Sequence, residues 1–171
     1  MVAKATKRKV LKMAKYDLED KKGFTVLGVG VELKSDFMDQ EGLNREKEEF
    51  FNQSIQDGTV AKLKEVAKND YLFVVNEAVD DKMMHYVGVE TDQELPEATR
   101  MIHFPEGKYI AIPGEATSQY ELADSLTNTA FGDVLYEETE YGYVGGPNAA
   151  VIMGEADGTF VGEMWIPVVK Q

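Results

Sequence analysis

The chain has 171 residues, 43% of them hydrophobic, which is enough for one domain with a sizeable core and argues against wholesale disorder. It contains no cysteine, which excludes disulfides, zinc–thiolate sites and a cysteine nucleophile. The formal net charge of -13 argues against nucleic-acid binding, which needs a basic surface, and suits a neutral or cationic small ligand better.

The basic residues gather at the start of the chain. Residues 1–22 hold eight of the 18 Lys and Arg residues but only three of the 31 acidic ones, so the rest of the chain is strongly acidic. We interpret 1–22 as a basic arm, either a short helix or disordered, and 23–171 as a single domain. The start does not resemble a signal peptide, and no stretch approaches the roughly 20 apolar residues of a membrane span. We therefore expect a cytoplasmic protein that contacts neither membrane nor nucleic acid directly.

The first half of the domain predicts a strand, two helices and a hairpin. Alternating apolar residues indicate the strands, apolar residues at helical spacing indicate the helices, and Asp57-Gly58 and Asp80-Asp81 are typical of a helix end and a turn. In chain order, the elements are a strand at 23–33, a polar loop at 35–43, a helix from Leu43, a short helix capped by Thr59, and hairpin strands at 70–77 and 82–89.

The second half repeats this order after an acidic linker at 90–97. Ser118 and Glu121 have the spacing of a capping box, which opens a helix. Each half therefore predicts strand, helix, strand and strand, and an internal duplication with half-repeats at about 23–92 and 98–171 is the simplest account of an α+β fold. The elements of the second half are a strand at 98–112 that bends or turns at 105–107, a helix from Ser118 to Val134, a loop at 141–146, and hairpin strands at 148–153 and 160–168.

The last predicted strand carries an acid and the only Trp of the chain. Because side chains alternate along a strand, Glu163 and Trp165 share one face, while Met164 and Ile166 point to the core. A carboxylate that faces an aromatic surface loses hydration, which costs free energy, and a ligand is one reason for a protein to accept that cost. The alternative is that Glu163 lies on a solvated face and Trp165 packs ordinarily.

The two predicted hairpins can be aligned through their final strands. The alignment places Tyr86 opposite Trp165 and Met84 opposite Glu163. If a pseudo-twofold axis relates the halves, Tyr86 and Trp165 form paired walls of one central cleft. A slip of one residue in register would reverse this prediction.

Four segments, 16–32, 100–113 with its Ile112-Pro113, 145–148, and 162–168 with Glu163 before Ile166-Pro167-Val168, together carry a family resemblance. They resemble the GyrI-like small-molecule-binding domain, which is also the effector-binding module of some AraC-type and MerR-type regulators. The family has a Tyr-x-Leu opening strand, an x-Ile-Pro strand before its second helix, and a closing strand in which an acid is followed shortly by x-Ile-Pro-Val. The resemblance spans nearly the whole chain from Tyr16 onward.

This resemblance implies a duplicated β-α-β-β fold, known as an SHS2 duplication, with an antiparallel sheet and a central ligand cleft. Members bind bulky, often aromatic or cationic compounds with an acidic residue and aromatic walls. Some are sensors fused to DNA-binding domains, some stand alone and bind protein or drug, and some resemble hydrolases that open the cyclopropane ring of DNA-alkylating natural products. Without a DNA-binding segment here, the hairpin at 76–86 with Glu163 and Trp165 looks more like the stand-alone subgroup.

Glu163 is the candidate catalytic residue, as a general base that positions or deprotonates water for attack on an electrophilic aromatic ligand. In the alternative, Glu163 stays ionised and only recognises a cation. Trp165 and Tyr86 would sandwich a planar ligand, and Met84 is flexible enough to adapt to varied ligands. Tyr71, Phe73 and Glu77 share one parity, and Glu77 is either a second acid in the cleft or a cap at the hairpin edge.

Other chemistry is not indicated. His85 and His103 are predicted to be packed or surface histidines, and two distant His without Cys make a zinc site improbable. The Gly28-Val29-Gly30 run lies inside a strand, so a dinucleotide site is excluded, and we expect no cofactor and no metal.

The sequence therefore predicts a stand-alone protein that binds bulky aromatic xenobiotics or natural products and hydrolyses reactive ones, which would be detoxification. The competing predictions are a non-catalytic binder of cationic drugs, an effector sensor, and a protein partner that modulates DNA gyrase.

Overall fold

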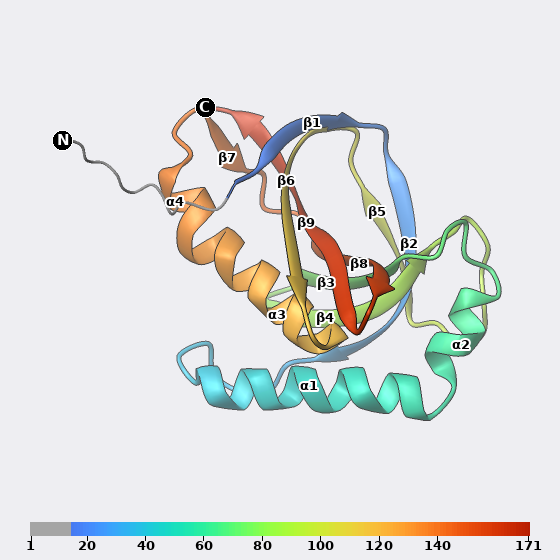
Figure 1. Ribbon diagram of the computed structural model, residues 1–171. Coiled ribbons are helices and arrows are strands. Elements are labelled where there is room, and N and C mark those ends of the chain that lie inside the picture. The colour runs from blue at the N-terminus through green and yellow to red at the C-terminus, as the bar shows by residue number, and fades with distance from the viewer. Residues whose placement is uncertain (1–14) are drawn as a thin grey trace.

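Antiparallel strands form one strongly curled sheet, with helices packed on its outer face, in residues 15–171, which the computed structural model describes (Figure 1). Neighbouring strands follow the order β1-β6-β9-β8-β3-β4-β2-β5, and β7 pairs with β9. The strands are β1 (Asp17–Lys21), β2 (Phe24–Glu32), β3 (Leu72–Val79), β4 (Lys82–Glu90), β5 (Arg100–Phe104), β6 (Gly107–Ala116), β7 (Tyr141–Tyr143), β8 (Asn148–Ala156) and β9 (Thr159–Lys170). The helices are α1 (Gln40–Gln56), α2 (Thr59–Lys64), α3 (Gln119–Thr129) and α4 (Leu135–Glu137), with a π-helical turn (Ala130–Val134) before α4.

This arrangement confirms the predicted α+β class and the antiparallel sheet. The predicted hairpin of β3 and β4 turns at Asp80 and Asp81, which both have positive φ. None of the helices among the described residues is long and apolar enough to cross a membrane.

Two short connections explain why the sheet curls. β1 and β5 are its two edges, yet only Lys22 and Gly23 join β1 to β2, and only Pro105 and Glu106 join β5 to β6. Since β2 lies beside one edge and β6 beside the other, both connections require the two edges to approach. Where they approach, the Phe24 ring lies 6.1 Å from the Tyr109 ring of β6. The sheet therefore encloses its own concave face, because the edge strands β1 and β5 approach each other.

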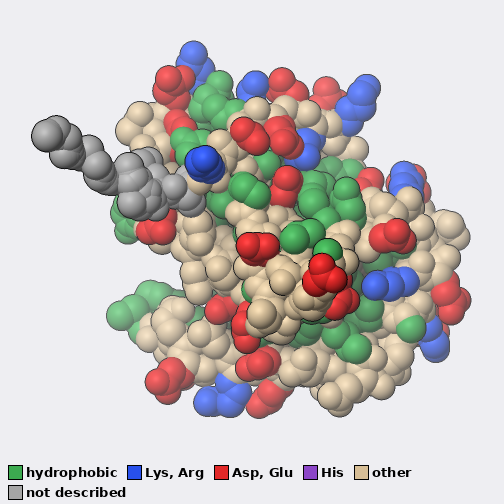
Figure 2. Space-filling model, viewed as in Figure 1, with side chains coloured by type: hydrophobic (Ala, Val, Ile, Leu, Met, Phe, Trp, Pro, Cys, Tyr) green, Lys and Arg blue, Asp and Glu red, His purple; other side chains and the backbone are tan. Residues whose placement is uncertain are grey.

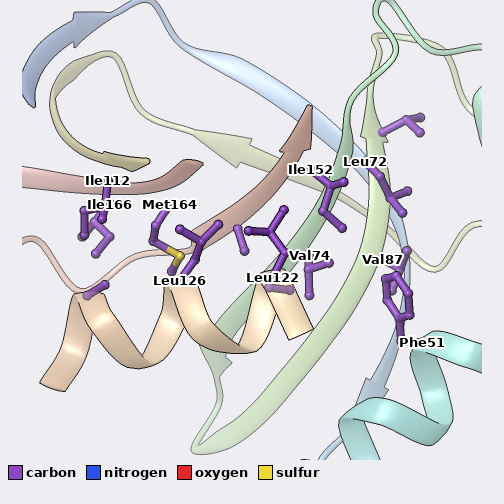
Figure 3. Close-up of a cluster of buried hydrophobic side chains, with 14 of the residues drawn as sticks. Phe51, Leu72, Val74, Val87, Ile112, Leu122, Leu126, Ile152, Met164 and Ile166 are labelled. Atoms are coloured by element: carbon purple, nitrogen blue, oxygen red, sulfur yellow. The ribbon is translucent and has the colours of Figure 1, made fainter. Parts of the chain in front are cut away.

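The alternation of side chains along the strands builds two hydrophobic clusters. The outer cluster lies between the sheet and the helices, where Leu122 and Leu126 of α3 face Val74 and Met164 of the sheet (Figure 3). The inner cluster fills the concave side, and its buried members are Val26, Phe73, Val75, Tyr86, Ile102, Phe104, Tyr109, Ala111, Ala149, Val151 and Trp165. Six strands therefore have apolar side chains on both faces: β6, β9, β8, β3, β4 and β2. Burial on both faces is the reason why these strands contain nearly continuous apolar runs.

Local side-chain bonds set the helix starts. The predicted Ser118 cap is confirmed, because its hydroxyl accepts a hydrogen bond from the Glu121 N–H at 3.1 Å. α1 begins at Gln40 rather than at Leu43, because the Asp39 carboxylate caps it by accepting from the Gly42 N–H at 3.0 Å. Thr59 does not cap α2; the cap residue is Gly58, in the left-handed conformation at φ 86°.

Three predicted segments differ in the structure. Of the bend or turn expected at 105–107, the structure has the turn, and β5 and β6 on its two sides are separate strands that lie in different parts of the sheet. The loop expected at 141–146 contains β7, which pairs with the end of β9. In the segment interpreted as a basic arm, residues 17–21 form β1, because they complete the backbone hydrogen bonds of β6. Residues 1–14 of that arm lie outside the described residues.

Candidate functional site

One row of paired residues crosses the concave face from Trp165 to Tyr86. Trp165 of β9 pairs with Ala149 of β8, Ala149 with Val75 of β3, and Val75 with Tyr86 of β4. Residues that pair in neighbouring antiparallel strands point to the same face. The structure thus places the two aromatic residues on one face, with the smaller Ala149 and Val75 between them.

Tyr86 does not form an open wall in this structure. Its side chain is only 1% exposed, and its ring lies over Gly30, where an added Cβ would come within 2.2 Å of the ring. Burial raises the pKa of Tyr86, and the nearby Glu77 carboxylate adds to this. Tyr86 is therefore enclosed in the inner cluster, and Trp165, which is 8% exposed, is a buried member of the same cluster.

An aromatic cluster surrounds Trp165. The ring centres of Phe24, Phe73 and Tyr71 lie 5.7, 5.8 and 6.5 Å from that of Trp165, in edge-to-face orientations. Such pairs add about 0.5–1.5 kcal/mol each beyond the area that they bury. Of the residues predicted from sequence, the structure thus brings Tyr71 and Phe73 together with Trp165.

Glu163 is bound to Trp165 along the same strand. The indole Nε1–H donates to Glu163 Oε1 at 2.8 Å, and Glu163 is half-buried. This bond fixes the orientation of the carboxylate and leaves its other oxygen without a hydrogen bond to a described residue. The charge is therefore held at a defined position beside the aromatic cluster.

A hollow of about 480 Å³ lies beside this carboxylate. It is formed where β8 bulges away from β9 between Ile152 and Gly154, a distortion that often re-aims side chains near functional sites. The strands can approach next to the bulge only because residue 162 is a glycine, since a Cβ there would lie 2.0 Å from the Val151 carbonyl oxygen. The residues that line the hollow are Pro113, Gly114, Glu115, Met153, Val161, Gly162 and Glu163.

A lysine of β1 covers the face of Trp165. The Lys21 ammonium lies 3.9 Å from the centre of the indole ring and pairs with the Glu19 carboxylate at 3.1 Å. Only 18% of the Lys21 side chain is exposed, so the ring face attracts this cation in a partly desolvated setting. The site thus contains a bound cation supplied by the protein itself.

Glu77 lies at a different place on the concave face. Its two oxygens accept hydrogen bonds from Arg100 Nε and Nη2, both at 2.9 Å, and its side chain is 10% exposed. The charge of Glu77 is therefore compensated by Arg100. Met84 pairs with Glu77 across the strands and packs, half-buried, against the inner cluster.

Three residues of the site were not predicted from the sequence. Phe24 and Lys21 cover Trp165, and Tyr109 lies against Phe24. The alternation from Phe24 to Val26 indicates a shared face, but only the approach of the sheet edges places that face over Trp165. Lys21 was assigned to the basic arm, so no sequence signal linked it to β9.

The histidines are packed or at the surface, as predicted. His85 is 2% exposed on the outer face, and its Nδ1 lies 2.8 Å from Asn76 Oδ1. His103 is exposed and bonds the Thr25 hydroxyl at 3.0 Å. Among residues 15–171, no group of three or more His, Asp or Glu side chains is placed to hold a metal ion.

Comparisons with known proteins support an effector-binding family. The family model described as Cass2, integron-associated effector binding protein, matches residues 17–168. Among curated proteins, none matches the sequence.

Three solved structures share the fold at low sequence identity. SAV2435 bound to tetraphenylphosphonium is 15% identical with a TM-score of 0.70, over 91% of this chain and 94% of its own. A putative transcription regulation protein from Staphylococcus aureus is 15% identical with a TM-score of 0.68, over 91% and 98%. The integron cassette protein VCH_CASS2 of Vibrio cholerae is 14% identical with a TM-score of 0.59, over 90% and 95%. At these identities the likeness concerns the fold alone.

Proposed function

Because the chain belongs to the Cass2 family of integron-associated effector binding proteins, we propose that it is a cytoplasmic protein that binds a bulky aromatic cation on its concave face. The ligand lies against Trp165 and the carboxylate of Glu163, and its apolar groups contact Phe73 and Tyr71. This assigns the ligand to the half of the concave face that contains β9, and not to the Glu77 and Arg100 pair.

The observation that carries the proposal is the position of Lys21. An ammonium already lies on the Trp165 ring, while the indole N–H holds Glu163 in place. A delocalised cation with aromatic groups gains the same attraction from the ring, and its charge is far cheaper to desolvate than an ammonium. Such a ligand can therefore displace Lys21 and use the carboxylate as its counter-ion.

Access comes from the hollow beside Glu163. Its volume of about 480 Å³ lies within the range of small-molecule sites, and Glu163 is on its border. To reach the Trp165 face, the ligand moves Lys21 and Phe24, both of which lie next to the two-residue connection of β1 and β2. Exposed connections with few buried contacts open at a lower cost than the strands of the core.

The class of ligand is supported by a structural neighbour. SAV2435 shares the fold and is bound to tetraphenylphosphonium, a cation whose charge is surrounded by aromatic rings. The concave face of this chain offers an acid and several aromatic rings, which suit that chemistry. On the face of the molecule that Figure 2 shows, acidic and basic side chains are interspersed and no basic patch is formed.

Titration with tetraphenylphosphonium tests the proposal. Trp165 is the only Trp, so binding on its ring changes the intrinsic fluorescence directly. We expect Glu163→Gln to weaken binding about tenfold, the effect of losing one partly screened charge contact. Glu115→Gln is the matched control, because Glu115 lines the same hollow but lies outside the indole contact. Equal effects of the two substitutions would show that only overall charge matters, and the Glu163 assignment would be withdrawn.

Hydrolysis of a reactive ligand remains a second proposal for the same site. The other oxygen of Glu163 borders a hollow with room for a water molecule beside a bound electrophile, which is the placement that a general base needs. Incubation with cyclopropane-bearing electrophilic aromatics, followed by mass spectrometry, measures ring opening. Turnover that is lost in Glu163→Gln while binding of the same compound persists supports this role; unchanged compounds with the wild-type protein refute it.

We also propose that the domain arose by duplication. The half that contains β2, β4 and β3 and the half that contains β6, β9 and β8 have the same strand order, and the halves meet at the pair of β3 and β8. Superposition of the two halves, with each helix following its first strand, measures whether a twofold rotation relates them.

A further inference from the structure

A second cavity lies on the opposite side of the sheet from Trp165. It has a volume of about 300 Å³ and opens between α1, the helical segment after α3, and the loop from β7 to β8. Asn76 forms part of its floor and points to the outer face, whereas its neighbour Val75 belongs to the inner cluster. The cavity therefore lies mainly on the outer face, and Glu77, next to Asn76 in β3, is the lining residue that the concave face shares with it. The residues that line it are Lys47, Asn76, Glu77, Ala78, Met83, Thr127, Phe131, Tyr143, Gly145 and Asn148.

Asn148, which lines this cavity, has a buried amide oxygen without a hydrogen-bond partner. Asn148 is only 5% exposed, and its Oδ1 makes no hydrogen bond. Its orientation is fixed by the neighbouring bonds: Tyr143 donates its hydroxyl proton to the Gly146 carbonyl, so Asn148 must donate to the Tyr143 oxygen, which it does at 3.1 Å. Oδ1 is then left as an acceptor, and a buried acceptor without a donor costs about 1–3 kcal/mol.

The outer face has a second buried acceptor without a partner, on His85. His85 is 2% exposed, and with its Nδ1–H donated to Asn76 Oδ1, the bare Nε2 also has no partner. Burial lowers the pKa of His85 to about 3, so the ring is neutral and Nε2 only accepts. The space before it is about 10 Å³, room for a single water molecule, and shares Lys47, Asn76 and Thr127 with the larger cavity. Among the residues that line the larger cavity, the unsatisfied hydrogen-bond acceptor is therefore Asn148 Oδ1.

The other residues that line the larger cavity indicate which ligand would complement Asn148 Oδ1. Lys47 offers N–H donors and is half-buried between α1 and the sheet, and burial lowers its pKa. Phe131 and Tyr143 stack edge to face at 5.6 Å, and with Met83 they give the mouth an apolar, polarisable wall. The cavity therefore requires a donor for Asn148 Oδ1 and an acceptor for Lys47. A hydroxyl group supplies both, since its proton is donated to Asn148 Oδ1 and its oxygen accepts a hydrogen bond from Lys47. An aromatic ring on the ligand packs against Phe131, Tyr143 and Met83.

We propose that this cavity is a second ligand site that takes a small hydroxylated aromatic compound, with the hydroxyl directed at Asn148 and the ring packed against Phe131 and Tyr143. The site is separate from the Trp165 site and is expected to be filled independently of it.

Paired probes test the hydrogen bond. Titrations with 2-naphthol and with 2-methoxynaphthalene, followed by protein-observed NMR, compare ligands of similar size that differ in the donor proton. We expect 2-naphthol to bind about tenfold more tightly and to shift the Asn148 side-chain amide signal. In Asn148→Leu, which has similar size and no acceptor, the preference for 2-naphthol is expected to vanish. Equal affinities of the two probes for the wild-type protein, or no binding of 2-naphthol, would overturn the proposal.

The location is tested with substitutions that do not touch the core. Phe131 is 37% exposed and Tyr136, in the same helical segment, is 82% exposed and lines neither cavity. Phe131→Ala is expected to weaken both probes at least threefold, and Tyr136→Ala to weaken neither, even if Asn148→Leu does not fold. Saturating tetraphenylphosphonium is expected to leave 2-naphthol bound. Its displacement would place 2-naphthol on the concave face and refute the second site.

Discussion

The Lys21 ammonium lies 3.9 Å from the centre of the Trp165 ring, in the position that a cationic ligand is proposed to take. Lys21 therefore competes with the ligand. We expect Lys21→Met to strengthen tetraphenylphosphonium binding about three- to tenfold, as the cation–π contact no longer has to be displaced.

The neighbouring Lys22 provides the control for this prediction. Lys22 is exposed and is not in contact with the ring, so Lys22→Met changes the net charge equally and is expected to leave the contact with Trp165 intact. Fluorescence titration of both variants makes the comparison. If the two substitutions strengthen binding to the same extent, the effect is one of net charge and Lys21 does not compete for the ring.

The ion pair of Glu77 and Arg100 is expected to support the fold, not ligand binding. The bond is bidentate, but Arg100 is 42% exposed, so solvent screens it and we expect Glu77→Gln to lower the free energy of unfolding by only about 1 kcal/mol. Urea denaturation at low and at 1 M salt measures this loss, which should shrink at high salt. Glu94→Gln, at an exposed acid, is expected to be neutral. A loss of tetraphenylphosphonium affinity in Glu77→Gln would show that Glu77 contributes to ligand binding.

Gly30 is expected to tolerate no side chain. An added Cβ would lie 2.2 Å from the ring of Tyr86, which is almost fully buried and cannot move aside without displacing the inner cluster. We expect Gly30→Ala to lower the free energy of unfolding by about 1–3 kcal/mol. Gly154→Ala, in a strand position with open space around it, is the control and should change little. Near-equal unfolding midpoints for the two variants would show that Tyr86 is not held as described.

His85 is expected to make stability depend on pH. Its folded pKa of about 3 lies below the ordinary value of 6.5, so the unfolded chain binds the extra proton between these values. Stability is thus fully present above pH 6.5 and falls as the pH drops toward 3. We expect the free energy of unfolding to be roughly 1 kcal/mol lower at pH 5.5 than at pH 7 from this group alone.

Two histidine substitutions isolate this contribution. His85→Gln is expected to flatten the pH dependence between pH 7 and 5.5 while costing stability at pH 7, because the bond to Asn76 changes. His103→Gln removes an exposed histidine and should keep the wild-type slope. The same slope in all three proteins would mean that His85 gains a proton in the folded state without penalty.

The sequence by itself determined the local structure and the composition of the faces. Strict alternation in the last strand separates Glu163 and Trp165 from Met164 and Ile166, and this separation holds because a strand has a side-chain period of two. The Ser118 cap follows from one hydroxyl and one N–H three residues later. These features depend on neighbours within a few residues, so no knowledge of the fold was needed to predict them.

Only the tertiary structure decided which residues complete the site. Trp165 and Tyr86 share a row because the strands run in the order β9, β8, β3, β4, and no local pattern specifies that order. Phe24 and Lys21 reach Trp165 because the two-residue connection of β1 and β2 brings the sheet edges together. The partner of Glu77 is Arg100 on β5, and no local pattern specifies that β5 pairs with β2. These contacts join residues far apart in the chain, and their geometry is set by how the whole sheet closes.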